Sequence, residues 1–258
     1  MVGLTFPCVV HETYPNPPLR AMLGQVQFPP VLRLGKGTGI IADLQEEIRS
    51  QFPGFALENQ FQITPGPAPG VDLATAYRFT SRDQRWSAVL SPVALTLEAT
   101  AGGRYGSYKD FALLFKVLWA GVVKHFRPSS VSRQGLRYVD HIEGERSPAD
   151  WAELVNPALL GTLVGTPLSR DLERSLAELV FSWPPGRQVV FRHGIAQAGP
   201  RNAKGYLLDF DSLHLEEWAS DDVDGLMARF EESHELLYTF FRWCVTDNAL
   251  EVFKHSAP

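Results

Sequence analysis

Hydrophobic and polar residues alternate along this chain with two different periods, and together these periods predict an α+β protein. Residues 22–28 alternate with a period of two and are followed by Pro29 and Pro30, a pattern typical of a β-strand. The same period predicts further strands at residues 57–63, 77–81, 86–90, 93–98, 132–143, 176–183, 189–196 and 206–211. Short turns separate many of these strands, so we expect them to pair as antiparallel neighbours.

Hydrophobic residues spaced three and four apart predict two long amphipathic helices, at residues 107–126 and 222–244. Ser107 is suited to cap the first of them, and shorter helices are predicted at residues 41–52 and 148–160. Each long helix must bury its apolar stripe. We therefore expect one extended antiparallel sheet with the helices packed on one face, which leaves the other face open.

The order of the predicted elements occurs twice along the chain. Residues 21–128 and residues 129–258 each contain a strand, a short helix, several strands and a long helix, which predicts a structural pseudo-repeat within one compact unit. The proline-rich residues 1–20 are predicted to form an extended N-terminal lead. Sequence identity between the halves is negligible, so a chance resemblance between two α+β stretches stays open as the alternative.

The open face of the sheet is the predicted ligand surface. Because side chains alternate along a strand, Asp209 and Asp211 point to this face, as do Arg137 and His141, whereas an inward Asp140 would need a partner. The same alternation places there Gln25, Gln27, Thr80, Thr96 and Glu98. The candidate ligand-binding residues are Arg78, Arg137, His141, Arg192, Asp209 and Asp211.

Two chemical interpretations of this surface compete. Asp209 and Asp211 are suited to share a divalent cation, with His141 or Glu98 nearby, but acidic residues at a strand end are also routine on a solvated face. The arginines are suited to bind an anionic group through their planar forks. The alternative is that they pair with the carboxylates across the sheet. We therefore predict neither a resident metal nor a cofactor.

The composition limits the kinds of partner and the cellular compartment that we expect. The 24 basic and 29 acidic residues give a formal charge of −5, which argues against binding of duplex nucleic acid in bulk. Cys8 and Cys244 form no metal-binding or redox pair and fit a reducing cytosol, and we expect both thiols to be buried or idle. Neither a signal peptide nor an apolar run of about 18 residues is present, so a cytoplasmic protein is expected. His234 on the last helix is expected to be a hydrogen-bonded core residue, with a ligand role as the alternative.

Two stretches near the N-terminus carry a family resemblance. Residues 14–19 (YPNPPL) and 24–30 (GQVQFPP) resemble the opening of a sporadically distributed family of uncharacterised prokaryotic proteins, and residues 135–142 and 207–211 resemble its later signatures. The resemblance implies no activity, but its patchy distribution is typical of defence-associated or mobile genes. The element order is also similar to saddle-shaped duplicated folds such as the TATA-binding protein, although the acidic charge departs from that family.

Three functions are consistent with these patterns. The favoured one is a non-catalytic binding or adaptor module whose open sheet face holds a protein partner or a small anionic ligand, in a prokaryotic defence context. The first alternative is a metal-dependent enzyme that acts on a phosphorylated or nucleotide substrate. The second is a defence component that binds single-stranded nucleic acid through arginines and exposed aromatic residues. The oligomeric state is left open.

Overall fold

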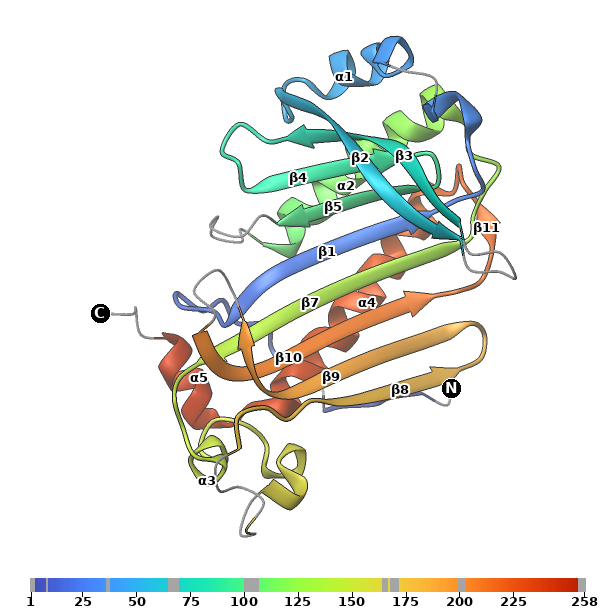
Figure 1. Cartoon of the computed structure of the whole chain (residues 1–258). Coiled ribbons are helices and arrows are strands. Elements are labelled where there is room, and N and C mark those ends of the chain that lie inside the picture. The colour runs from blue at the N-terminus through green and yellow to red at the C-terminus, as the bar shows by residue number, and fades with distance from the viewer. Residues whose placement is uncertain are drawn as a thin grey trace. The chain divides into compact units, whose positions relative to one another are not determined.

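The computed structural model describes residues 3–7, 9–35, 38–64, 70–99, 107–163, 167, 172–198 and 203–254. Within these residues, nine strands form one antiparallel sheet in the order β2-β3-β4-β5-β1-β7-β10-β9-β8 (Figure 1). The strands are β1 (Leu19–Gln27), β2 (Gly54–Thr64), β3 (Gly70–Thr80), β4 (Trp86–Ser91), β5 (Ala94–Ala99), β7 (Arg133–Glu143), β8 (Ala177–Trp183), β9 (Arg187–Ala198) and β10 (Ala203–His214). Two short strands, β6 (Ser130–Val131) and β11 (Trp218–Ala219), pair separately.

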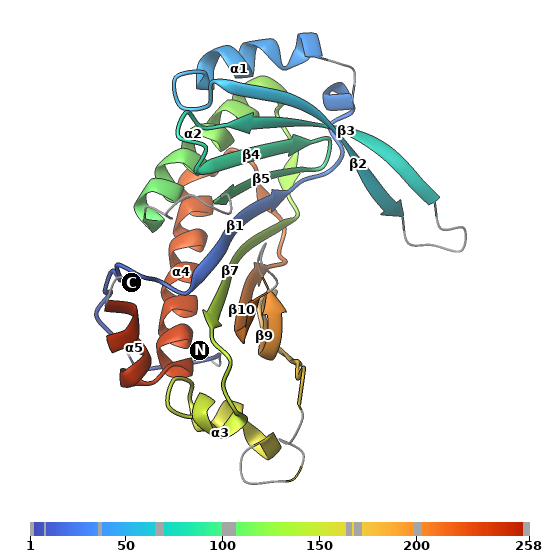
Figure 2. The same ribbon diagram turned by 60° about the vertical axis from the view of Figure 1, so that its left-hand side comes forward.

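The helices pack on one side of the sheet, which confirms the predicted α+β class and the predicted layering (Figure 2). They are α1 (Ala42–Ile48), α2 (Tyr108–Phe126), α3 (Pro148–Trp151), α4 (Val223–Cys244) and α5 (Asp247–Lys254). Short 3-10 turns lie at Leu32–Gly35, Thr38–Ile40, Pro157–Leu159 and Gly161–Leu163. None of the helices within the described ranges combines the length and the apolar character that a membrane crossing requires.

One predicted helix is much shorter in the structure, and a proline blocks its C-terminal part. The helix predicted at residues 148–160 ends after one turn, at Trp151, and is followed by the 3-10 turn at Pro157–Leu159. The residue before a proline avoids the helical region, and Asn156 accordingly has an extended ψ of 122°. Its side chain instead caps the 3-10 turn by accepting a hydrogen bond from the backbone of Ala158.

The chain divides into two compact units. Unit 1 comprises residues 1–22, 137–212 and 232–258, and unit 2 comprises residues 23–136 and 213–231. The strands β1, β7 and β10 and the helix α4 contribute residues to both units. The pseudo-repeat of residues 21–128 and 129–258 stays a prediction.

In unit 2 the core forms where α2 and the first turns of α4 cover the sheet. Ser107 caps α2 as predicted, because its side chain accepts a hydrogen bond from the backbone N–H of Asp110. Phe111 of α2 then lies directly over Gly24 of β1 and meets Phe230 of α4 edge-on, with ring centroids 5.4 Å apart. The strand presents glycine at this point because the phenyl ring occupies the space that any side chain would need.

In unit 1 the core is a cluster of aromatic rings on the helix side of β9 and β10. Phe240 of α4 contacts Phe191 and Phe210, with ring centroids 4.6 and 5.1 Å away, and those two rings stack on each other at 4.9 Å. Phe210 therefore points inward, as the alternation of β10 predicts. Cys244 at the end of α4 is a buried free thiol, whereas Cys8 lies outside the described residues.

The close approach of Phe111 to Gly24 predicts the effect of adding one methyl group. In a Gly24→Ala variant the new Cβ would lie 2.2 Å from Phe111 Cζ, so α2 or the ring must shift. We expect the free energy of unfolding to fall by about 1–3 kcal/mol, measured by urea denaturation. Gly39→Ala is the control, because its Cβ meets nothing within 4 Å and the expected change is below about 0.5 kcal/mol. Equal stability of the two variants would contradict the packing described.

Candidate functional site

Four charged residues form a ladder across the strands of unit 1, on the face that the helices do not cover. Arg137 of β7 donates through Nε and Nη2 to both carboxylate oxygens of Asp209 on β10, and each bond is 2.8 Å long. Arg192 of β9 lies with Nη1 3.5 Å from the same carboxylate and donates through Nε to Glu178 of β8 at 2.6 Å. These four residues are called the ion-pair ladder below.

Asp209 is the centre of the ion-pair ladder. Its side chain is only 4% exposed, whereas that of Arg137 is 42% exposed. The hydrogen bonds with Asp209 raise the pKa of Arg137, and the charge of Asp211 contributes in the same direction. Because two guanidinium groups already occupy and neutralise Asp209, its carboxylate is poorly suited to a divalent cation. The arrangement is the cross-strand pairing that was the alternative to binding of an anionic group by the arginines.

His141 is enclosed, in contrast to the expected accessible side chain. It shares the Arg137 face of β7 by alternation but is almost fully buried, and its Nε2 lies 3.4 Å from the carbonyl oxygen of Ala196. Gly205 packs against the ring, since a Cβ at that position would lie 2.4 Å from Nε2. Burial lowers the pKa of His141, so the imidazole is neutral near pH 7. A neutral and covered ring is a structural residue rather than an acid or base for an external substrate.

Arg78 belongs to unit 2 and forms a separate network there. Its Nη1 donates to Glu98 of β5 at 2.7 Å and its Nη2 to Glu58 of β2 at 3.1 Å, and a further hydrogen bond joins it to Ser87. These hydrogen bonds, with Glu58 first, raise the pKa of Arg78. The six predicted residues therefore divide between the units, with Arg78 in unit 2 and the other five in unit 1.

The strand registers of unit 2 agree with the faces deduced from alternation. Gln25 of β1 lies opposite Thr96 of β5, and the amide of Gln25 donates to the Thr96 hydroxyl at 2.9 Å. Gly24 lies opposite Leu97 on the side that Phe111 covers. Polar and apolar positions thus separate onto the two faces in the way the sequence predicts.

His234 has the hydrogen bond that was expected of a core histidine, with Tyr138 Oη 2.9 Å from its Nδ1. Burial, with a smaller contribution from His11, lowers the pKa of His234 to about 3. His11 of the N-terminal lead lies beside it, with ring centroids 5.1 Å apart, and its Nε2 is 3.0 Å from Glu235 Oε2. Sequence patterns miss this cluster because His11 and Glu235 are 224 positions apart and no spacing motif connects them.

Asp140 is a second buried carboxyl group in unit 1, on the helix side of β7. Burial raises its pKa to about 8, an effect that Arg20 partly offsets and Asp209 reinforces. The sequence suggested that an inward Asp140 would need a partner. At neutral pH a bound proton takes the place of that partner, because protonation removes the charge that burial penalises.

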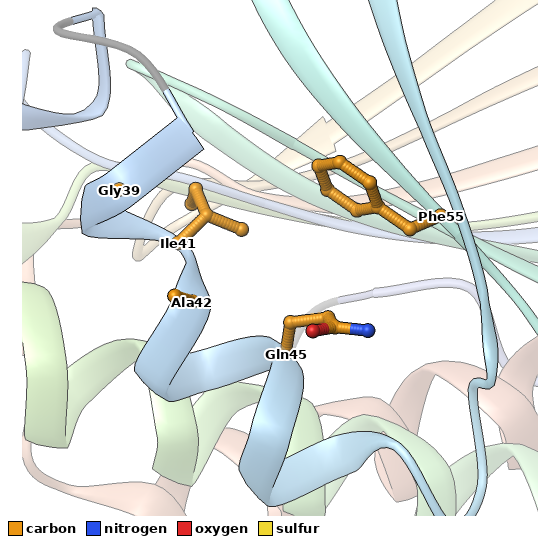
Figure 3. A pocket seen from close by; sticks show the side chains of 5 residues that line it. All are labelled: Gly39, Ile41, Ala42, Gln45 and Phe55. Carbon is orange, nitrogen blue, oxygen red and sulfur yellow. The ribbon is translucent and has the colours of Figure 1, made fainter.

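A pocket of about 320 Å³ lies between α1 and β2 in unit 2 (Figure 3). Its lining residues are Gly39, Ile41, Ala42, Gln45 and Phe55. The phenyl ring of Phe55 and the side chain of Ile41 form opposite walls. None of these five lining residues is ionisable. They therefore supply no acid, base or charged metal ligand to a molecule bound in the pocket.

No known protein-family model matches the chain, and no curated protein sequence matches it. The resemblance to a sporadically distributed prokaryotic family stays a prediction.

The ion-pair ladder predicts a measurable coupling between Arg137 and Asp209. Arg137→Met leaves the buried carboxylate with Arg192 alone, and we expect a loss of about 1–2 kcal/mol in unfolding free energy, limited by the partial exposure of Arg137. Urea denaturation of both single variants and the double variant with Asp209→Asn should give a coupling above about 0.5 kcal/mol. Arg82→Met, at an exposed position, is the control and should change little. Strict additivity would show that the pair contributes no stability.

Because the pKa of Asp140 is raised, we expect the effect of Asp140→Asn on the free energy of unfolding to depend on pH. Between the ordinary aspartate pKa of about 4 and the folded-state value of about 8, the folded protein retains a proton that the unfolded chain has released. Stability due to this residue therefore falls as pH rises, by at most about 1.4 kcal/mol per pH unit. The stability of Asp140→Asn relative to the wild type should rise from pH 5 to pH 8 in urea unfolding. A difference that does not change with pH would show that Asp140 titrates normally.

Proposed function

We propose that the chain is a non-catalytic binding module that holds a protein partner on the open sheet face of unit 1. The observation that carries this proposal is the ion-pair ladder, which fixes two partly exposed arginines on that face. In the described part of unit 1, α4 and α5 lie on the opposite side of the strands (Figure 2). Among the residues that the structure describes, neither of these helices covers the ladder face, which supports its use as a binding surface.

Aliphatic side chains lie between the charged residues of this face. Val139, Val180, Val190 and Leu207 are each two positions from a ladder residue on the same strand, so they share its face. Val180 is 55% exposed and lies opposite Val190 in the register of β8 and β9. Arginine is enriched in protein–protein interfaces, and Val180 adds an exposed apolar side chain beside the ladder.

The charge balance of the ladder favours a protein over an anionic ligand. Arg137 and Arg192 are matched by Asp209 and Glu178, so the four residues have no net charge. A free phosphate or a nucleic-acid backbone would have to displace Asp209 or Glu178 from an arginine before it gained a full ion pair. A protein surface carries both hydrogen-bond donors and acceptors and can bind the ladder side chains without separating them. Because these side chains are already held in place by their ion pairs, less entropy is lost on binding.

Catalysis by the predicted carboxylates has less support. Both oxygens of Asp209 accept hydrogen bonds from Arg137, and His141 is enclosed. An enzyme that used these groups would require an accessible acid, base or metal ligand among them. A binding module, in contrast, requires only that the side chains of the ladder face are held in fixed positions.

A charge placed in the middle of the ladder face tests the proposal. Val180→Glu should retain the fold, because the side chain is already largely exposed, but it should disrupt contacts with a partner. We expect its affinity for the partner to fall at least about tenfold, equivalent to about 1.4 kcal/mol. The partner is first captured by chemical crosslinking to the wild-type chain in its source cells, with products of neighbouring genes as candidates, and affinity is then measured by calorimetry.

Leu113→Glu is the matched control, because Leu113 is an exposed aliphatic residue on α2 in unit 2. It should bind the partner like the wild type. Equal binding by Val180→Glu, or the failure of the wild-type chain to retain any protein, would overturn the proposal.

A further inference from the structure

Three potential metal ligands come together where the N-terminal lead of unit 1 meets α4. His11, His234 and Glu235 each offer one ligand atom, and within the described residues these atoms lie within 4.8 Å of one another. We infer that His11, His234 and Glu235 bind a transition-metal ion, for which Zn²⁺ is the best match. The residues lie on the helix side of unit 1, so this inference is independent of the proposed function of the ladder face.

The separation of the ligand atoms suits a small tetrahedral ion. Zinc binds imidazole nitrogen and carboxylate oxygen at about 2.0–2.2 Å, which places neighbouring ligand atoms about 3.3 Å apart. His11 Nε2 and Glu235 Oε2 are already 3.0 Å apart. Both side chains are exposed, so modest rotations bring them and His234 around one ion.

Neighbouring aromatic residues hold both imidazoles in place. Tyr138 Oη lies 2.9 Å from His234 Nδ1, a contact that fixes the orientation of this imidazole within the cluster. His11 stacks on the ring of Tyr238, with centroids 3.9 Å apart. Orientation of ligating histidines by groups behind them is a regular feature of metal sites.

The ligand types select the metal. Two imidazoles and one carboxylate suit zinc and leave a fourth position for water, whereas Mg²⁺ and Ca²⁺ prefer oxygen ligands. The ion would act as a clasp between the lead and α4. The lead already contacts this helix, because Glu12 N donates to Tyr238 Oη at 2.8 Å and that hydroxyl donates to the Val10 carbonyl at 3.2 Å.

Calorimetric titration of the full-length, untagged and chelator-treated chain with ZnCl₂ at neutral pH tests the inference. We expect one equivalent of Zn²⁺ per chain and no binding heat with MgCl₂. His11→Ala and Glu235→Gln should each weaken binding at least about tenfold, and Tyr138→Phe about tenfold through loss of the orienting hydroxyl. Zn²⁺ should also raise the melting temperature of the wild type but not that of His11→Ala.

Two variants serve as controls. Glu231→Gln, at an exposed position on α4, should bind Zn²⁺ like the wild type. Cys8→Ser should also retain binding, which separates the site from a thiol three positions before His11 in the sequence. The inference is overturned if the wild type binds no Zn²⁺ or if His11→Ala binds it equally. Loss of binding in Cys8→Ser with retention in Glu235→Gln overturns it as well.

Discussion

The bidentate pair between Arg137 and Asp209 is the interaction on which the open face of unit 1 depends. A carboxylate as buried as Asp209 is costly unless a charged partner and hydrogen bonds compensate it. Arg137 supplies both, and Arg192 then connects the same carboxylate to Glu178. Asp140, the other buried carboxyl group in the described part of unit 1, lacks such a bidentate contact and is neutralised by a proton instead. Opposite faces of one sheet thus accommodate buried acids by different means.

Local patterns were sufficient to predict the layers of the fold. Alternation assigned Phe210 to the core and Asp209 to the open face, because the two sides of a strand differ in what they contact. Helix periodicity located α2 and α4, and the cap at Ser107 was recognisable from its residue type and position. At residues 148–160, Asn156 and Pro157 explain why no helix continues past Val155, although α3 already ends at Trp151.

Properties that depend on the order of strands were not predictable from one sequence. The enclosure of His141 requires Gly205 of β10 beside it, and nothing in the local pattern of β7 identifies that neighbour. The separation of Arg78 from Arg137 likewise follows from the placement of β2–β5 and β7–β10 within the strand order. The approach of His11 to His234 depends on the path of a proline-rich segment with little regular structure of its own.

The position of β8 as the last strand of the sheet has a consequence for how the protein behaves in solution. Its outer backbone groups form an edge, and its side chains include the exposed Leu179 and Val180, with Glu178 as the only charged residue. Edges of this composition template pairing with strands from other chains, which leads to self-association. A partner on the ladder face would protect β8 only if its contact extended past Glu178 and Val180 to these outer backbone groups.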